Sequence, residues 1–107
     1  MNIELPLLAI GAAEELERLR RNKSTNLNQT KKLSSIIKKD FTWRLDYSVI
    51  FSNAYFSTYN EKIPKLEEKN STNYINDISN KLIDPSNLKE KELGELRDFC
   101  VNLSDHA

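Results

Sequence analysis

The stretch from Lys31 to Tyr59 concentrates the aromatic side chains of this 107-residue chain. It contains the only Trp, three of the four Phe and three of the four Tyr. Aromatic rings carry the largest apolar area per residue, so this stretch must supply much of the core. Polar and charged segments flank it on both sides. The remaining segments therefore have to cover it.

The apolar pattern of this stretch fits two kinds of secondary structure. Residues 41–51 alternate between apolar and polar side chains, with Ile50 as the exception, which is typical of a half-buried strand. A helical spacing of four residues connects Leu33, Ile37, Phe41 and Leu45. Arg44 and Ser48 interrupt the apolar face of such a helix.

The positions of glycine and proline favour the helix. The only glycines are Gly11 and Gly94, and tight hairpin turns require glycine or asparagine–glycine at positive φ. No proline interrupts the aromatic stretch before Pro64. We therefore expect one long buried helix over residues 28–59. A strand at residues 41–51 in a small α+β domain is the alternative.

Three further amphipathic helices complete the predicted fold. The first begins with Pro6, whose missing N–H costs nothing at the first helical position. The pair Asp84-Pro85 offers a cap and a first residue for the last helix. The four predicted helices span residues 6–21, 28–59, 72–83 and 85–104. Together they predict a single all-α domain over residues 1–107, a compact four-helix bundle-like fold with one long central helix.

The sequence contains few residues that could form a catalytic site. The only histidine, His106, is the penultimate residue, where chains fray, so Ser-His and Cys-His catalysis are not expected. Two isolated glycines cannot form the glycine-rich loop that binds phosphate groups. The only cysteine, Cys100, excludes an intramolecular disulfide and a cysteine-rich zinc site, and we expect it in the core. The sequence predicts no enzyme, no cofactor, no metal site and no small-molecule substrate.

The apolar run near the N-terminus ends by Ala13. It is too short for a membrane span and lacks the basic flank of a secretory signal. We therefore expect a cytoplasmic protein without a membrane partner.

Acidic and basic residues are equal in number, 16 of each, but they are unevenly distributed. No acid lies between Arg18 and Lys39, an interval that contains Arg18, Arg20, Arg21, Lys23, Lys31, Lys32, Lys38 and Lys39. Such a cluster can follow a phosphate backbone, so nucleic-acid binding is an alternative function. No aromatic residue is interleaved with these bases, and the acidic second half can neutralise them within the fold or across a dimer.

Residues 40–46, with the sequence Asp-Phe-Thr-Trp-Arg-Leu-Asp, resemble the Phe-x-Trp-Arg-x-Asp opening of the COMM domain. That family is an adaptor module with a small sheet and a terminal helix, so the resemblance implies a strand at this place. The closing amphipathic helix lies at a compatible distance. Residues 53–80 lack the two apolar strands that such a domain needs, and no family property is carried over to this chain.

The predicted function is a non-catalytic protein-interaction module, either a small binder, inhibitor or adaptor, antitoxin-like or immunity-like, or a subunit of a complex. A helix over residues 28–59 would be apolar on more sides than three other helices can cover. Part of it is therefore expected to be buried only against another protein or a second copy. Trp and Arg are enriched at binding hot spots. The predicted partner-binding residues are Trp43, Arg44, Tyr47 and Tyr55.

Overall fold

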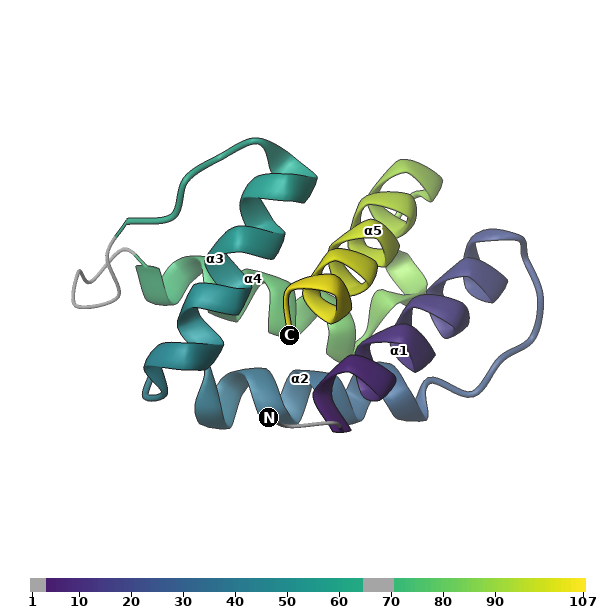
Figure 1. Ribbon diagram of the computed structural model, residues 1–107. Coiled ribbons are helices and arrows are strands. Elements are labelled where there is room, and N and C mark those ends of the chain that lie inside the picture. Colours follow the sequence, from purple (N-terminus) through teal and green to yellow (C-terminus); the bar gives the residue numbers. More distant parts are fainter. Residues whose placement is uncertain (1–3, 65–70) are drawn as a thin grey trace.

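Helices form all the regular secondary structure of residues 4–64 and 71–107, the part of the chain that the computed structural model describes (Figure 1). They are α1 (Glu4–Arg20), α2 (Asn28–Asp40), α3 (Leu45–Tyr59), α4 (Ser71–Ile83), the short 3-10 turn η1 (Pro85–Asn87) and α5 (Glu90–His106). The predicted all-α, bundle-like fold is confirmed. The alternative strand at residues 41–51, which the COMM resemblance also implied, is wrong because these residues form a turn and the first half of α3.

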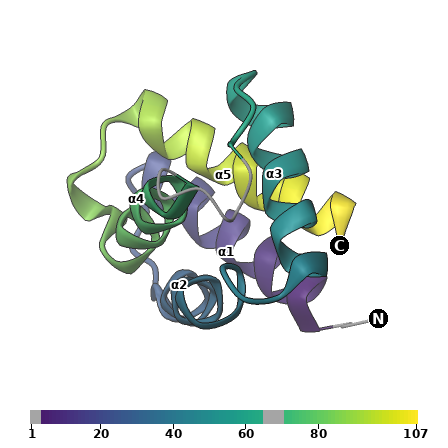
Figure 2. The same ribbon diagram turned by 90° about the vertical axis from the view of Figure 1, so that its left-hand side faces the viewer.

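The helices stack in layers (Figure 2). α1 and α4 both pack on α2, and α5 packs on α1. α3 packs along α5 at the edge of the molecule. α5 thus contacts α1, α3 and α4. Its buried ring Phe99 lies 5.2 Å from Phe51 and 6.3 Å from Tyr55, measured between centroids. The core is therefore assembled around α5 as well as around the aromatic stretch.

The predicted single helix over residues 28–59 is wrong, because the chain turns between Asp40 and Leu45 and forms two helices. The backbone N–H groups of Trp43 and Arg44 both donate to the Asp40 carbonyl oxygen, at 3.2 and 2.9 Å. These bonds close the end of α2. Arg44 then adopts an extended backbone, with φ −104° and ψ 118°, and α3 begins.

Aromatic packing across this turn explains why one straight helix does not form. Phe41 is fully buried, and its ring centroid lies 5.0 Å from that of Tyr47 and 5.9 Å from that of Phe51. In a continuous helix, ten residues of rise would separate Phe41 from Phe51 by about 15 Å. Burial of a Phe side chain contributes roughly 1.5–3 kcal/mol. A backbone hydrogen bond contributes only about 1 kcal/mol net. The rings therefore determine where the helix breaks.

The predicted helix over residues 85–104 also divides into two. Pro85–Asn87 forms a single 3-10 turn, and the Ser86 N–H donates to the Asp84 carboxylate at 3.4 Å. The chain is extended again before α5 begins at Glu90. Asp84 and Pro85 thus start a helix as predicted, but it is a short one.

The carboxylate of Glu15, on α1, caps the start of α2. This side chain is buried, and it accepts hydrogen bonds from the backbone N–H groups of Gln29, at 3.0 and 3.1 Å, and of Thr30, at 3.0 Å. Both N–H groups belong to the first turn of α2, where the N-cap residue Leu27 makes no side-chain capping bond. A carboxylate also suits the positive end of the helix dipole. α1 therefore determines where α2 begins.

A second carboxylate of α1, Glu17, connects α1 to α5. It accepts hydrogen bonds from Arg20 at 2.7 Å, from Arg21 at 2.6 Å and from Arg97 on α5. Arg20 also donates to Glu90 at the start of α5, at 2.9 Å. The three guanidinium groups, Arg20 first, hold the pKa of the Glu17 carboxyl well below its usual range. Glu17 therefore stays ionised in weak acid.

Replacing Glu15 with Gln is expected to lower the free energy of unfolding by about 1–2 kcal/mol, which is what helix caps contribute. The amide nitrogen of the glutamine is a donor and would face at least the Gln29 N–H, which Oε2 of Glu15 accepts at 3.1 Å. Urea unfolding followed by circular dichroism measures the change. Glu14→Gln, at an exposed neighbouring position, is the matched control. Equal unfolding midpoints for the two variants would contradict the capping role.

The stability that Glu17 supplies is expected to disappear in acid. Its pKa is depressed in the folded state, so the contribution is fully present above the ordinary value of 4.5 and is lost as the pH falls below it. Between about pH 6 and about pH 3, the free energy of unfolding should fall further for the wild type than for Glu17→Gln. An identical fall in both proteins would show that other carboxyl groups cause the acid dependence.

Candidate protein-binding surface

α3 is apolar on two opposite sides. One side carries the buried side chains of Tyr47, Phe51, Ala54 and Tyr55, which belong to the core. The opposite side carries apolar side chains that are exposed to solvent. A helix that is apolar on most sides normally packs on several neighbours. Only one of the two apolar sides of α3 is covered within the described part of this chain.

The exposed apolar side chains follow the outer side of α3 in one line. Leu45 is 77% exposed, Val49 is 50% exposed and Phe56 is 44% exposed. With Ser52 between Val49 and Phe56, the spacing is four, three and four residues, which aligns side chains along one face of a helix. Trp43, 83% exposed, stands in the turn just before Leu45. We call Trp43, Leu45, Val49 and Phe56 the outer α3 strip.

Arg44 lies beside this strip and is held in place by its neighbours. The guanidinium carbon lies 4.1 Å from the centroid of the Tyr47 ring, and one guanidinium nitrogen donates to Asp46 at 3.3 Å. A cation–π contact at an exposed site contributes about 0.5–1 kcal/mol. The two contacts fix a positive charge and free N–H donors at the end of the strip that carries Trp43.

A surface hollow of about 440 Å³ lies at the other end of the strip. It is lined by Ser52, Asn53, Phe56, Ser57, Lys62, Ile63 and His106. The segment that forms one wall is held by Asn60, which ends α3 in a left-handed conformation (φ 55°), and by the Tyr74 hydroxyl, which donates to Glu61 at 2.7 Å. Phe56 and Ile63 make part of the lining apolar. The hollow can therefore receive an apolar side chain.

The predicted partner-binding residues separate into exposed and buried pairs. Trp43 and Arg44 are exposed, as a binding role requires. Tyr47 is 2% exposed and Tyr55 is 9% exposed, so both rings pack within this chain. Burial raises the pKa of Tyr55 to about 12. The two buried tyrosines are not part of a binding surface, because a partner has no access to their rings.

Three residues of the outer α3 strip were not predicted from the sequence to bind a partner. They are Leu45, Val49 and Phe56. Leu45 was assigned to the core face, because a helix over residues 28–59 places it in line with Phe41. Once α3 is known to begin at Leu45, the line from Leu45 through Val49 to Phe56 separates from the core face by spacing alone. The missing information was the position of the turn.

The bases between Arg18 and Lys39 do not form one surface. Arg20 and Arg21 are engaged by Glu17. Arg18 and Lys23 are exposed near the end of α1. The exposed side of α2 carries Lys31, Lys32, Lys38 and Lys39, which we call the α2 lysine face. None of these four lysines forms an ion pair with a residue that the structure describes.

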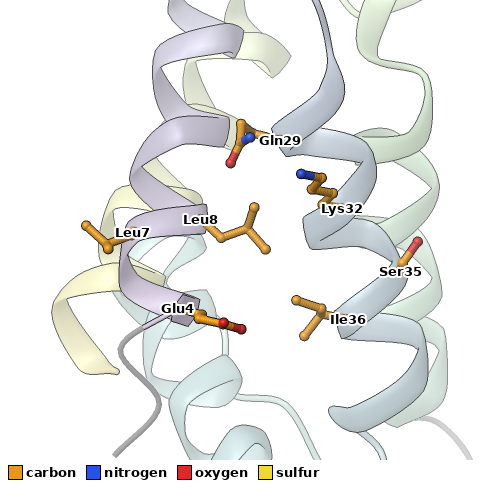
Figure 3. A pocket seen from close by; sticks show the side chains of 7 residues that line it. All are labelled: Glu4, Leu7, Leu8, Gln29, Lys32, Ser35 and Ile36. Atoms are coloured by element: carbon orange, nitrogen blue, oxygen red, sulfur yellow. The ribbon is translucent and has the colours of Figure 1, made fainter.

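A groove of about 600 Å³ lies between α1 and α2 (Figure 3). Leu8 and Ile36 point toward one another across it, whereas Leu7 points away. Its polar lining consists of Glu4, Gln29, Lys32 and Ser35. The groove shares Lys32 with the α2 lysine face and shares no residue with the outer α3 strip. It is therefore a separate surface.

The histidine and the cysteine have different environments. The sequence predicts a frayed position for His106, but α5 continues through it and its Nε2 lies 3.3 Å from the Ser57 hydroxyl oxygen. Both of these side chains are exposed. Cys100 is buried, as predicted, and burial raises the pKa of its thiol far above the ordinary value. A buried neutral thiol is a poor nucleophile.

A metal-binding cluster and a membrane-spanning helix are two other features that residues 4–64 and 71–107 could contain. No three His, Cys, Asp or Glu side chains of this part are grouped so that they could hold a metal ion. Within the same residues, no helix combines the length and the apolar character that a membrane crossing requires.

No protein-family model matches this chain, and no curated protein or solved structure matches it. A functional assignment therefore depends on the surfaces described above. These are the outer α3 strip with the hollow at its end, the α2 lysine face and the groove between α1 and α2.

Trp43 is expected to contribute little to the stability of the isolated chain. Trp43→Ser should change the free energy of unfolding by less than about 0.5 kcal/mol, because the ring is exposed. Phe51→Ala, at a buried ring, should cost about 3–5 kcal/mol and serves as the contrast. In dilute solution, Trp43 emission should be red-shifted and fully quenched by iodide. Strong destabilisation by Trp43→Ser would place the ring in the core.

Proposed function

We propose that this protein is a protein-interaction module that binds through the outer α3 strip. The observation that supports the proposal is the alignment of Leu45, Val49 and Phe56, all exposed, along one side of a helix whose other side forms the core, with the exposed Trp43 in the turn just before it. Contiguous apolar surface that is exposed on a protein often marks an interaction site.

The composition of the strip resembles that of an interface centre. Trp is the residue type most enriched at binding hot spots, and Arg is enriched as well. Here Trp43 and Arg44 are adjacent, and the contacts of Arg44 with Asp46 and Tyr47 restrict its movement. An ordered side chain loses less conformational entropy when a partner binds. The hollow beside Phe56 provides a recess next to this apolar line.

We further propose that the module is not an enzyme and acts as a small binder, inhibitor, adaptor or complex subunit. The only thiol is buried and hard to ionise. The Ser57–His106 pair lies in the open, where water competes for its hydrogen bond. A cytoplasmic location is part of the same proposal, because the single cysteine is a free thiol.

A quantitative pull-down from lysate of the source cells tests the binding surface. The wild type, Trp43→Ser with Leu45→Ser, and Leu7→Ser are immobilised at equal density. Leu7 is 69% exposed on α1 and lies off the strip, so its variant is the matched control. At least one protein should be retained by the wild type and the control and reduced about tenfold or more by the strip variant. Identical retention by all three proteins would overturn the proposal.

The α2 lysine face supports nucleic-acid binding as a second candidate function. Four exposed lysines on one helix side, without ion pairs to described residues, offer their charges to phosphate groups. Contact with four phosphates of duplex DNA predicts a loss of affinity of roughly 100-fold between about 50 and about 200 mM salt.

Fluorescence anisotropy with labelled duplex DNA and single-stranded RNA at these two salt concentrations tests this candidate. Lys31→Glu with Lys38→Glu should abolish binding, whereas Lys91→Glu, at an exposed position on α5, should not. Absence of binding by the wild type at low salt would eliminate this function.

A further inference from the structure

We infer that the partner of the outer α3 strip is a second copy of this chain, paired with the first through antiparallel α3 helices about a two-fold axis. The inference rests on the proposed function, because it names the partner for the same strip. Four features of the described residues support it. They are the spacing of the strip, the position of the hollow, the charges at the two ends and the direction of the α3 helix dipole.

The spacing of the strip is the same when it is read from either end. Leu45, Val49, Ser52 and Phe56 are separated by four, three and four residues. In an antiparallel pair, Leu45 therefore lies opposite Phe56 of the second copy, and Val49 lies opposite Ser52. A two-fold interface requires this self-complementarity, because each copy presents the same surface to the other. The small Ser52 near the axis allows the helices to approach closely.

The same pairing places Trp43 at the hollow of the second copy. Trp43 precedes Leu45, so in an antiparallel pair it extends past Phe56 of the second copy, toward the wall formed by Lys62 and Ile63. Phe56 and Ile63 supply an apolar lining for its ring. Each hollow is thus completed by the Trp of the other copy. Two such insertions form per dimer.

An acidic and a basic side chain at opposite ends of the strip come together in this arrangement. Asp46, which already accepts a hydrogen bond from Arg44, is exposed near the start of α3, and Lys62 is exposed just beyond its end. Lys62 forms no ion pair with the described residues, and antiparallel pairing brings Asp46 of the second copy to its side. The helix dipoles also oppose one another favourably. A parallel pairing would bring Asp46 against Asp46 and would leave both hollows empty.

Analytical ultracentrifugation across a concentration series, with Trp43 emission recorded on the same samples, tests the pairing. The mass should rise from one chain to two, and emission should shift to the blue over the same concentration range. A single-chain mass at the highest concentration would overturn the inference. A dimer whose Trp43 emission stays red-shifted would overturn it as well.

Two variants show whether the dimer uses the strip. Val49→Asp places a charge beside the axis and should weaken dimerisation about 30-fold or more, the loss expected for a buried unpaired charge in an interface. Leu7→Asp, at an exposed position on α1, should leave dimerisation unchanged. Both positions are exposed in the single chain, so circular dichroism should show that both variants fold. Equal dimerisation constants for the two variants would overturn the inference.

Disulfide formation distinguishes antiparallel from parallel pairing. Ser52 lies near the axis, so Ser52→Cys should form a disulfide between copies on mild oxidation. In the antiparallel pair, Leu45 lies about 16 Å along the helix from Leu45 of the second copy, so Leu45→Cys should not. The buried Cys100 remains unreacted in the folded protein. A Leu45→Cys disulfide formed as readily as the Ser52→Cys disulfide would overturn the antiparallel arrangement.

The experiments separate failure of this inference from failure of the proposed function. A monomer that still retains a cellular protein through Trp43 and Leu45 keeps the proposed function and removes the second copy as the partner. A monomer that retains no protein through the strip removes both.

Discussion

Packing of the Phe41 ring against Tyr47 and Phe51 is the interaction on which the rest of the structure depends. It requires the chain to turn after Asp40 and so divides the aromatic stretch into α2 and α3. Because α3 then packs along α5, its second apolar side is left at the surface. The exposed strip is thus a direct consequence of how the core closes.

Polar side chains at the helix contacts determine how the other helices are aligned. Glu15, which is buried, accepts hydrogen bonds from the start of α2, and Glu17, which is partly exposed, accepts one from Arg97 on α5. Between α2 and α4, the buried hydroxyl of Ser34 donates to the backbone carbonyl oxygen of Ser79 at 2.7 Å. Buried polar groups are costly unless they are paired, so the bonds of Glu15 and Ser34 favour one alignment over neighbouring ones.

Much of the fold could be predicted from local pattern, and the failures share a physical cause. Helical periodicity and the absence of central glycines favoured helix over strand at residues 41–51, and the structure has no strand there. The turn at residues 41–44 contains no glycine or proline, so no local signal marks it, and it exists because rings ten residues apart attract one another. The Glu15 cap joins residues fourteen positions apart, so no short stretch of the sequence indicates it either.

The candidate site was predicted only in part for the same reason. Trp43 was correctly placed at the surface, because an aromatic segment with several apolar sides exceeds what three helices cover. Tyr47 and Tyr55 were assigned to the surface wrongly, since their orientation depends on where α3 starts. A shift in the start of a helix rotates every later side chain by a fixed angle. If the position of the turn had been known, Leu45, Tyr47 and Tyr55 would all have been assigned to the correct sides of α3.

The capping of α2 from α1 has a consequence for the connector between them. Since the acceptor for the first N–H groups of α2 is Glu15, residues 23–27 supply no side chain that α2 needs in order to start. Doubling the length of such a loop costs only about 0.6 kcal/mol. The connector is therefore the place where this small domain can accept an inserted peptide or a whole second domain while its helices stay in register.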